Sequence, residues 1–348
     1  MKNILLSVLF FTGTISIYAQ IADSYRELPN PVQTDLTQWD KVNTPKVSWG
    51  STDVRYKKEV PPSVDIKKNL TLSAWKGERV CAQFVIWSGE EIKELNFSAE
   101  DLRNGEESIG KEHLTTAFVR YVMTDELNKD GNGGCGQRPD PTKFDSTLVA
   151  DPIDHITPSL LIPSHSTQGG WVSIHIPSQV KAGAYRGTIL VKDGEKVIST
   201  LGITVNVGQR TLPPPSEWAF HLDLWQNPYA VARYYQVTPW SKEHFDYMRP
   251  HMKLYADAGG KSITASIMHK PWNGQTYDYF ESMVTWIKKA DGTWMFDYTV
   301  FDKWVEFMME MGIRKQINCY SMVPWKLSFR YFDQATNSLQ SVSTQPGE

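Results

Sequence analysis

The feature that most constrains the fold is a change of hydrophobic period at the proline run of residues 213–215. Before that run, short apolar stretches have the two-residue period of strands; after it, apolar strands alternate with amphipathic helices. Such an alternation builds a parallel sheet, which buries its faces only when it is complete, as a closed barrel or a doubly wound sheet. About three strand and helix units fit into residues 218–348. We therefore expect these residues to be the front part of a larger α/β domain.

Residues 63–210 are predicted to form an antiparallel β-sandwich. Short alternating stretches are separated by turn sequences, such as the one at residues 192–195, and this pattern is typical of two packed antiparallel sheets. The predicted strands are residues 70–74, 80–87, 95–99, 117–122, 170–176, 185–191 and 199–207. Residues 20–62 have no sustained period and contain several prolines, which predicts an irregular arm over this domain.

After a proline linker at residues 211–217, residues 218–348 are predicted to be an incomplete catalytic barrel, the first units of a TIM-like (β/α)8 fold. Ser241 is a candidate N-cap for a helix that ends at Gly259, and Gly312 stops a second helix. The predicted strands are residues 220–225, 261–268 and 316–320, with inserted hairpins at 284–287 with 294–296 and at 327–332 with 339–342. An unfinished sheet exposes an edge, so we also expect poor solubility.

The first 19 residues predict a secretory signal peptide. Lys2 supplies the positive start, residues 4–17 are nearly all apolar or small, and Ala19 is a small residue before the expected cleavage. The alternative is an N-terminal membrane anchor, but the stretch is short for a membrane span and polar residues follow at once. We expect an exported protein, periplasmic or extracellular, with no membrane span after cleavage.

Charge and cysteine content exclude several classes of partner. The net charge is −3 with both signs interspersed, which argues against a nucleic-acid partner. Three widely spaced cysteines argue against a disulfide framework and a cysteine-rich zinc site, and no cofactor is indicated. The chain is rich in aromatic residues, with 13 Trp and 15 Tyr. Such rings either fill cores or stack on sugars, so their positions in the chain must decide between packing and sugar binding.

Several of these aromatic residues follow predicted barrel strands, where the active site of a βα barrel lies. The first strand leads to Asp223 and Gln226, the second to Lys270 and Asn273, and the third to Ser321, each beside a tryptophan or tyrosine. Flat rings and hydrogen-bonding side chains together are what a pyranose needs. We therefore predict a sugar-binding wall made of Trp225, Asn227, His269, Trp272, Tyr320 and Trp325. The alternative for each tryptophan is a role in packing, and for His269 that of an ordinary hydrogen-bonded histidine.

Glycoside hydrolysis requires two carboxyl groups, one to transfer the proton and one to attack or to stabilise the developing cation. The adjacent Asp125 and Glu126 follow a predicted sandwich strand and lead into a glycine-rich loop, so we do not expect them to be catalytic. Asp223 is better placed, at the end of the first barrel strand, but stands alone. No second carboxylate is evident at the barrel mouth, and we assign no catalytic residue.

Residues 128–133 resemble the opening of a calcium loop, with oxygen ligands at alternate positions and a glycine for the turn. The twelfth position is Pro139, which cannot provide the bidentate carboxylate. We expect a solvated loop and predict no metal site. The glycine-rich residues 131–136 lack the lysine and helix of a phosphate loop.

Several segments, in a fixed order, carry a likeness to a known family: residues 74–84, 183–189, Leu212 with Pro213, 223–228, 268–273 and 320–325. Together they resemble glycoside hydrolase family 123, exported bacterial β-N-acetylgalactosaminidases with an N-terminal sandwich and a catalytic βα barrel. The resemblance covers nearly all of the chain after the signal peptide.

The resemblance implies hydrolysis of a terminal β-linked N-acetylgalactosamine by a retaining, substrate-assisted reaction. The carbonyl oxygen of the sugar's own 2-acetamido group attacks the anomeric carbon. In the family, an adjacent Asp and Glu near the end of the fourth barrel strand orient that group and act as acid and base. The pair is expected beyond residue 348, no residue here inherits either role, and we expect the chain alone to be inactive.

A second hypothesis is a non-catalytic carbohydrate-binding or surface protein that uses its sandwich. An open platform of Trp75, Trp87 and Trp171, with Trp225 and Trp272 buried, would favour binding by the sandwich. The reverse would favour the hydrolase.

Overall fold

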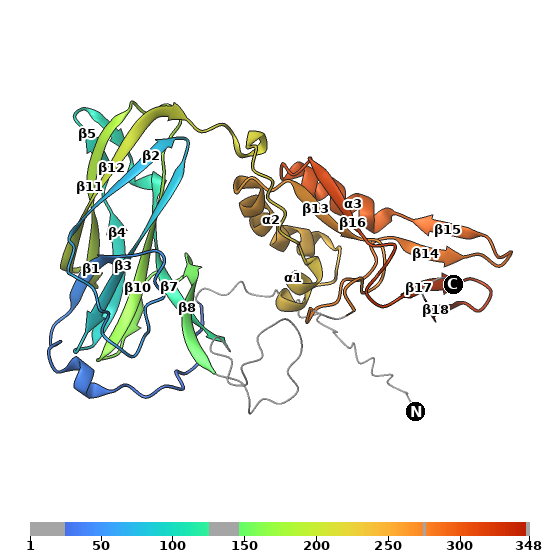
Figure 1. Cartoon of the computed structure of the whole chain (residues 1–348), viewed down its shortest axis with the longest axis horizontal. Helices are drawn as coiled ribbons and strands as arrows, with labels where there is room; N and C mark the ends of the chain where they lie inside the picture. The colour runs from blue at the N-terminus through green and yellow to red at the C-terminus, as the bar shows by residue number, and fades with distance from the viewer. Residues whose placement is uncertain (1–24, 125–145, 274–275, 346–348) are drawn as a thin grey trace, which may run out of the picture.

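The structure of the protein, a computed structural model, describes residues 25–124, 146–273 and 276–345. It is mostly β-sheet with few helices, arranged as two parts that a short linker joins (Figure 1). The predicted signal peptide, Asp125, Glu126 and the glycine-rich loop at 128–136 lie outside the described residues. No helix of the described residues is long and apolar enough to cross a membrane.

The N-terminal part consists of two sheets. One has the order β1 (Lys46–Gly50), β3 (Arg79–Ser88), β10 (Ser166–His175), β7 (Leu114–Thr124), β8 (Thr147–Asp154). The other has the order β2 (Asn69–Lys76), β12 (Lys196–Thr211), β11 (Gly183–Asp193), β4 (Ile92–Ala99), β9 (Leu160–Ile162), with the short β5 (Leu102–Asn104) and β6 (Glu107–Ile109) beside β11. Neighbouring strands are antiparallel except β2 and β12, which run parallel. Each strand predicted in this region has a counterpart, while β1, β5, β6, β8 and β9 were not predicted.

The two sheets share one apolar core. Phe84 from β3 is completely buried; its ring contacts Trp49 of β1 and Phe97 of β4 edge to face. Alternate residues of the strands in both sheets point into this core, as the period of a strand requires. Gly170 is needed in β10 because a Cβ there would lie 2.3 Å from the ring of Phe84. Cross-sheet packing therefore holds this part together.

The residues before β2 are not wholly irregular, because they contain the edge strand β1, antiparallel to β3. A buried charge cluster also anchors this segment. Arg120 of β7 donates to Glu27 at 2.6 Å and to Asp154 at 2.7 Å, and Lys58 donates to Glu27 at 2.5 Å. Burial alone would raise the pKa of Glu27, but these hydrogen bonds outweigh it and hold the pKa below its usual value.

The C-terminal part contains the parallel pair β13 (Ser262–Ser266) and β16 (Gln316–Tyr320) and the helices α1 (Pro228–Tyr235), α2 (Lys242–Asp257) and α3 (Thr299–Glu310). Ser241 caps α2 as predicted, since its side chain accepts from the amide of His244. Side chains of α2 and α3 pack with those of β13 in one core, and the indole of Trp304 donates to the Thr264 carbonyl at 3.0 Å.

Three features of this part differ from expectation. Residues 220–225 are not a strand; Leu222 alone makes an isolated parallel bridge, to Gly260, and neighbouring Phe220 and Leu224 are exposed. Helix α1 was not predicted. The two predicted hairpins, β14 (Thr285–Lys288) with β15 (Trp294–Asp297) and β17 (Ser328–Asp333) with β18 (Ser338–Ser343), join through β14 and β17 into one four-stranded sheet.

Candidate functional site

The segments that follow β13 and β16 and the Leu222 bridge meet at one end of the parallel pair. Ser266 of β13 pairs in register with Tyr320 of β16, and both strands run in the same direction. The amide of Gln226 donates to the Thr264 hydroxyl at 3.3 Å, and the Thr264 amide donates to the side chain of Gln226 at 2.8 Å. These bonds fix the residues around Trp225 against β13.

Three of the predicted wall residues form one aromatic cluster. The rings of Trp225 and Trp272 are stacked, with centroids 4.6 Å apart and planes inclined by 27°. Tyr320 lies 5.1 Å from Trp225 and 4.7 Å from Trp272, and Phe280 packs edge to face on Trp272 at 4.7 Å. Trp272 is only 6% exposed, whereas Trp225 is 53% exposed. Trp272 is thus the packed base, and Trp225 is the ring available to stack on a sugar.

Beside this cluster lies a charged group. Nδ1 of His269 is 2.6 Å from Oε2 of Glu281, and Arg330 of β17 donates to the same oxygen at 3.4 Å. Burial is the largest influence on His269 and lowers its pKa, while Glu281 partly opposes that effect. The backbone carbonyl of Glu281 accepts from the hydroxyls of Tyr229, at 2.9 Å, and Ser266. The site therefore contains a histidine and a carboxylate in direct contact.

Asn227 is occupied by local structure. Its side-chain oxygen accepts from the Tyr229 amide at 3.1 Å and so caps α1, and its Nδ2 donates to the Asp278 carbonyl at 2.9 Å. Asp278 also pairs with Arg233 of α1 at 2.6 Å. Asn227 fixes the start of α1 and the segment that leads to Phe280 and Glu281.

Trp325 lies on the loop after β16, which is tied to the loop after β13 because its amide donates to the Pro271 carbonyl at 2.9 Å. Its side chain is 68% exposed. It therefore stands at the rim of the site, as an exposed ring on a loop that contacts the Trp272 segment.

Asp223 accepts from Nδ2 of Asn318, on β16, at 2.7 Å through one oxygen. The other oxygen is buried and has no hydrogen-bond partner among the described residues. Burial, followed by the charge of Asp223, raises the pKa of the neighbouring Tyr320 hydroxyl. Tyr320 therefore stays protonated and available as a donor at neutral pH.

The sequence analysis singled out neither Glu281, which contacts His269, nor Arg330, which donates to the same carboxylate oxygen. That Asp223 is without a second carboxylate at the strand ends stays a prediction. Glu281 lies twelve positions after His269 in the sequence, with no periodic pattern between them. The contact arises because the segment folds back, so that the Lys270 amide donates to the Phe280 carbonyl at 2.8 Å. No group of three or more potential metal ligands occurs within the described ranges.

The N-terminal part does not present an open tryptophan platform. Trp75 is 44% exposed, but Trp87 is buried and Trp171 packs partly buried against a small core of β7 and β8. In the C-terminal part, Trp225 is exposed and Trp272 is buried beneath it. Neither predicted arrangement holds, because the C-terminal part combines an exposed Trp225 with a buried Trp272.

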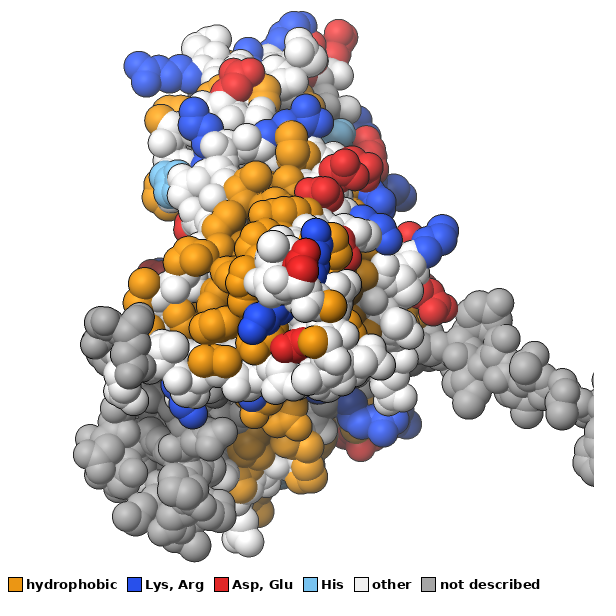
Figure 2. All heavy atoms as spheres, turned by 90° about the vertical axis from the view of Figure 1, so that its right-hand side faces the viewer, with side chains coloured by type: hydrophobic (Ala, Val, Ile, Leu, Met, Phe, Trp, Pro, Cys, Tyr) orange, Lys and Arg blue, Asp and Glu red, His pale blue; other side chains and the backbone are white. Residues whose placement is uncertain are grey.

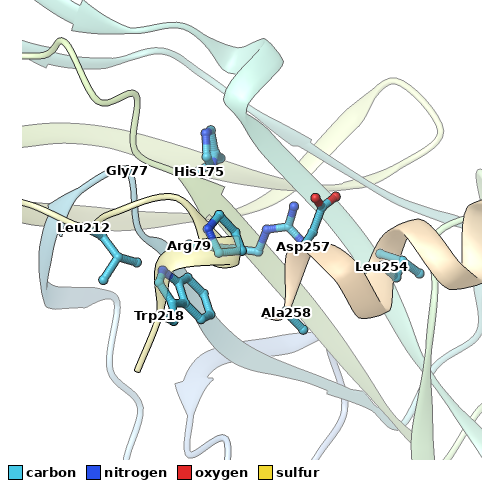
Figure 3. Close-up of a pocket in the computed structure, with 9 residues that line it drawn as sticks. Gly77, Arg79, His175, Leu212, Trp218, Leu254, Asp257 and Ala258 are labelled. Carbon is cyan, nitrogen blue, oxygen red and sulfur yellow. The ribbon is translucent and has the colours of Figure 1, made fainter. Parts of the chain in front are cut away.

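A cleft of about 430 Å³ lies between the two parts, away from the aromatic cluster (Figure 3). Arg79 and His175, paired in register on β3 and β10, line it from the N-terminal part, while Asp257 at the end of α2 and Trp218, just after the linker, line it from the C-terminal part. Burial, then the charges of Arg79 and His113, lowers the pKa of His175. The cleft contains charges of both signs where the two parts meet.

Comparison with known proteins identifies two domain families. The model of the glycoside hydrolase 123 N-terminal domain matches residues 49–193, and that of the glycoside hydrolase 123 catalytic domain matches residues 225–348. A search of curated protein sequences found no match.

Among solved structures, a family 123 glycoside hydrolase from Clostridium perfringens, studied for glycolipid glycan hydrolysis, is 29% identical with a TM-score of 0.77. The match covers 88% of this chain and 53% of that one, so the chain spans about half the length of this relative. The N-terminal domain of PorA is 9% identical over 47% of this chain and 97% of its own, with a TM-score of only 0.22.

Proposed function

The chain belongs to glycoside hydrolase family 123, and from that premise we propose that it is the N-terminal part of an exported bacterial glycosidase that removes terminal β-linked N-acetylgalactosamine. Its N-terminal part would be a β-sandwich, and its C-terminal part the first units of a (β/α)8 barrel. The observation that carries the proposal is the exposed face of Trp225, stacked on Trp272 beside Tyr320.

The proposed wall matches the chemistry of N-acetylgalactosamine. The ring of Trp225 offers a flat apolar surface for the apolar face of the pyranose. The Tyr320 ring lies 5.1 Å from that of Trp225. Its hydroxyl, and His269 on the segment after β13, would provide polar atoms for sugar hydroxyls. Asn227 and Trp272 would support the wall from below, since one caps α1 and the other is buried.

The proposed reaction is retaining and substrate-assisted. The acetamido carbonyl oxygen attacks the anomeric carbon while an acid protonates the departing glycosidic oxygen; water then attacks the same carbon and restores the acetamide. The proposal places the orienting Asp and the acid/base Glu of the family outside this sequence. The chain alone would therefore bind the sugar without cleaving it.

The test combines turnover with binding, using the full chain and an aryl N-acetyl-β-galactosaminide. We expect no turnover, but a saturable change of tryptophan fluorescence with N-acetylgalactosamine. Trp225→Ala should weaken this binding about tenfold, as loss of one stacked ring predicts. Trp75→Ala, an exposed tryptophan of the N-terminal part, is the matched control.

Turnover by the chain alone at the rate of a complete enzyme would refute the placement of the catalytic carboxylates outside it. If Trp75→Ala lost sugar binding while Trp225→Ala retained it, the result would instead support a binding protein that uses its N-terminal part.

A further inference from the structure

Building on the proposed sugar-binding function, we propose that Glu281 is a positioning residue that holds the His269 imidazole with its proton on Nδ1. Nε2 is then left as a hydrogen-bond acceptor for a hydroxyl of the bound sugar. Glu281 acts through His269 and need not touch the sugar itself.

The contact between the two side chains decides the tautomer. A carboxylate only accepts hydrogen bonds, so a ring nitrogen 2.6 Å from Oε2 of Glu281 must carry a proton. Arg330 donates to the same oxygen and favours the ionised carboxylate. A neutral imidazole with its proton on Nδ1 has an unprotonated Nε2 on the opposite edge.

The backbone of Glu281 is held in place by its carbonyl group and by the residue before it. Its carbonyl accepts from the hydroxyl of Tyr229 and from that of Ser266, the last residue of β13. The preceding Phe280 packs on Trp272 at 4.7 Å. The carboxylate is thus fixed relative to the same indole that supports Trp225, and His269 is oriented with the aromatic cluster as one unit.

Exposure agrees with this division of roles. The side chain of His269 is 13% exposed and that of Glu281 46% exposed. Burial lowers the pKa of His269 more than Glu281 raises it, which favours the neutral ring at neutral pH. A neutral imidazole that accepts a hydrogen bond discriminates between hydroxyl orientations, because it needs a donor at one position.

The experiment is nitrogen NMR of the full chain labelled with ¹⁵N-histidine, at neutral pH and without sugar, with His269→Gln to assign the signals. We expect wild-type His269 to show a protonated Nδ1 and an unprotonated Nε2. In Glu281→Ala the proton should move largely to Nε2, the tautomer preferred by a free imidazole. Glu281→Gln retains an acceptor oxygen and should restore the wild-type pattern.

Glu306→Ala, an exposed carboxylate on α3, is the matched control and should leave the His269 signals unchanged. A wild-type ring protonated on Nε2, or a Glu281→Ala ring that keeps its proton on Nδ1, would overturn the proposal. Both can be observed without sugar binding.

Titration with N-acetylgalactosamine then tests the link to function. We expect Glu281→Ala to weaken binding about tenfold and Glu281→Gln to recover most of it. Unchanged affinity in Glu281→Ala would refute the role in recognition. A wild-type chain with the expected tautomer but no saturable binding would support the positioning role of Glu281 and contradict the proposed function.

Discussion

The two parts of the molecule bury their apolar residues to different degrees. In the N-terminal part, two sheets face one another and enclose a single core that includes Phe84, Ile174 and Val205. In the C-terminal part, hydrophobic side chains gather at the surface (Figure 2). Those more than half exposed there are Phe220, Leu224, Trp225, Tyr234, Leu254, Tyr277, Met322, Val323, Trp325 and Leu339. Among the described residues, the N-terminal part has five such side chains, those of Leu28, Leu36, Ile66, Ile156 and Leu161. The part that contains the candidate site therefore has the larger share of exposed apolar side chains.

This difference separates stability from recognition. In the N-terminal part, the packing of a closed core between two sheets stabilises the fold. The exposed tryptophan of this part, Trp75, belongs to no exposed aromatic cluster in the described segments of the chain. Exposed aromatic surface beside a histidine and a carboxylate is instead typical of a binding region. The contrast predicts that substitutions in the N-terminal core change stability and that those on the open C-terminal surface change recognition or solubility.

The largest expected effect is that of Phe84→Ala. The ring is completely buried and lies between Trp49 and Phe97, so its removal leaves a cavity that links both sheets. We expect the free energy of unfolding to fall by about 3–5 kcal/mol, measured by urea denaturation followed by circular dichroism. A loss below about 1 kcal/mol would show that this core adjusts to the cavity and would weaken the comparison.

Much of the fold could be predicted because local signals agreed with the final packing. The alternation at residues 185–191 lies in β11, and Ser241 caps α2. Strand β8 was missed because it contains Pro152, which a strand tolerates at the edge of a sheet, and β8 is an edge strand. Its edge position is a property of the tertiary structure that no local pattern encodes.

The site could be predicted only in part. Trp225, Trp272 and Tyr320 were predicted to lie together because each stands at or after the end of a predicted strand, and the structure brings their rings together. Their role in sugar binding stays a prediction. The contact of Glu281 with His269 depends on a chain reversal and had no local signal. The capping role of Asn227, by contrast, could have been predicted, because asparagine before a proline is a typical helix start.

A second prediction concerns the buried charge cluster of the N-terminal part. Arg120→Met leaves Glu27 and Asp154 without their shared partner and should cost about 3 kcal/mol at pH 7. Lys58 and Arg120 lower the pKa of Glu27, and hydrogen bonds from Thr157, Ile156 and, last, Arg120 lower that of Asp154. The stabilisation by Arg120 is therefore present above the unfolded pKa of about 4 and is lost as the pH falls through the folded values. The difference between wild type and variant should therefore shrink on acidification.

Urea midpoints of the two proteins between pH 7 and pH 3 measure that difference. Tyr25→Phe, which keeps the ring near Arg120 but removes a hydroxyl, is the control and should show no such pH dependence. A difference that grows toward low pH would mean that the carboxylates are not the partners that Arg120 stabilises.

The smallest expected effect on stability, and the sharpest test of the comparison, comes from the open surface. Phe220 and Val323 are 67% and 74% exposed, so replacing both by serine should change the free energy of unfolding by less than about 0.5 kcal/mol each. The same changes remove apolar area from the C-terminal surface and should raise the soluble monomer fraction in light scattering. Leu161→Ser, at a 59% exposed position of β9, is the matched change in the N-terminal part and should leave the monomer fraction unchanged. A large loss of stability in the double variant would show that this surface is buried in solution by self-association. The apolar side chains of both parts would then be buried, those of the N-terminal part within one chain and those of the C-terminal part against a second copy.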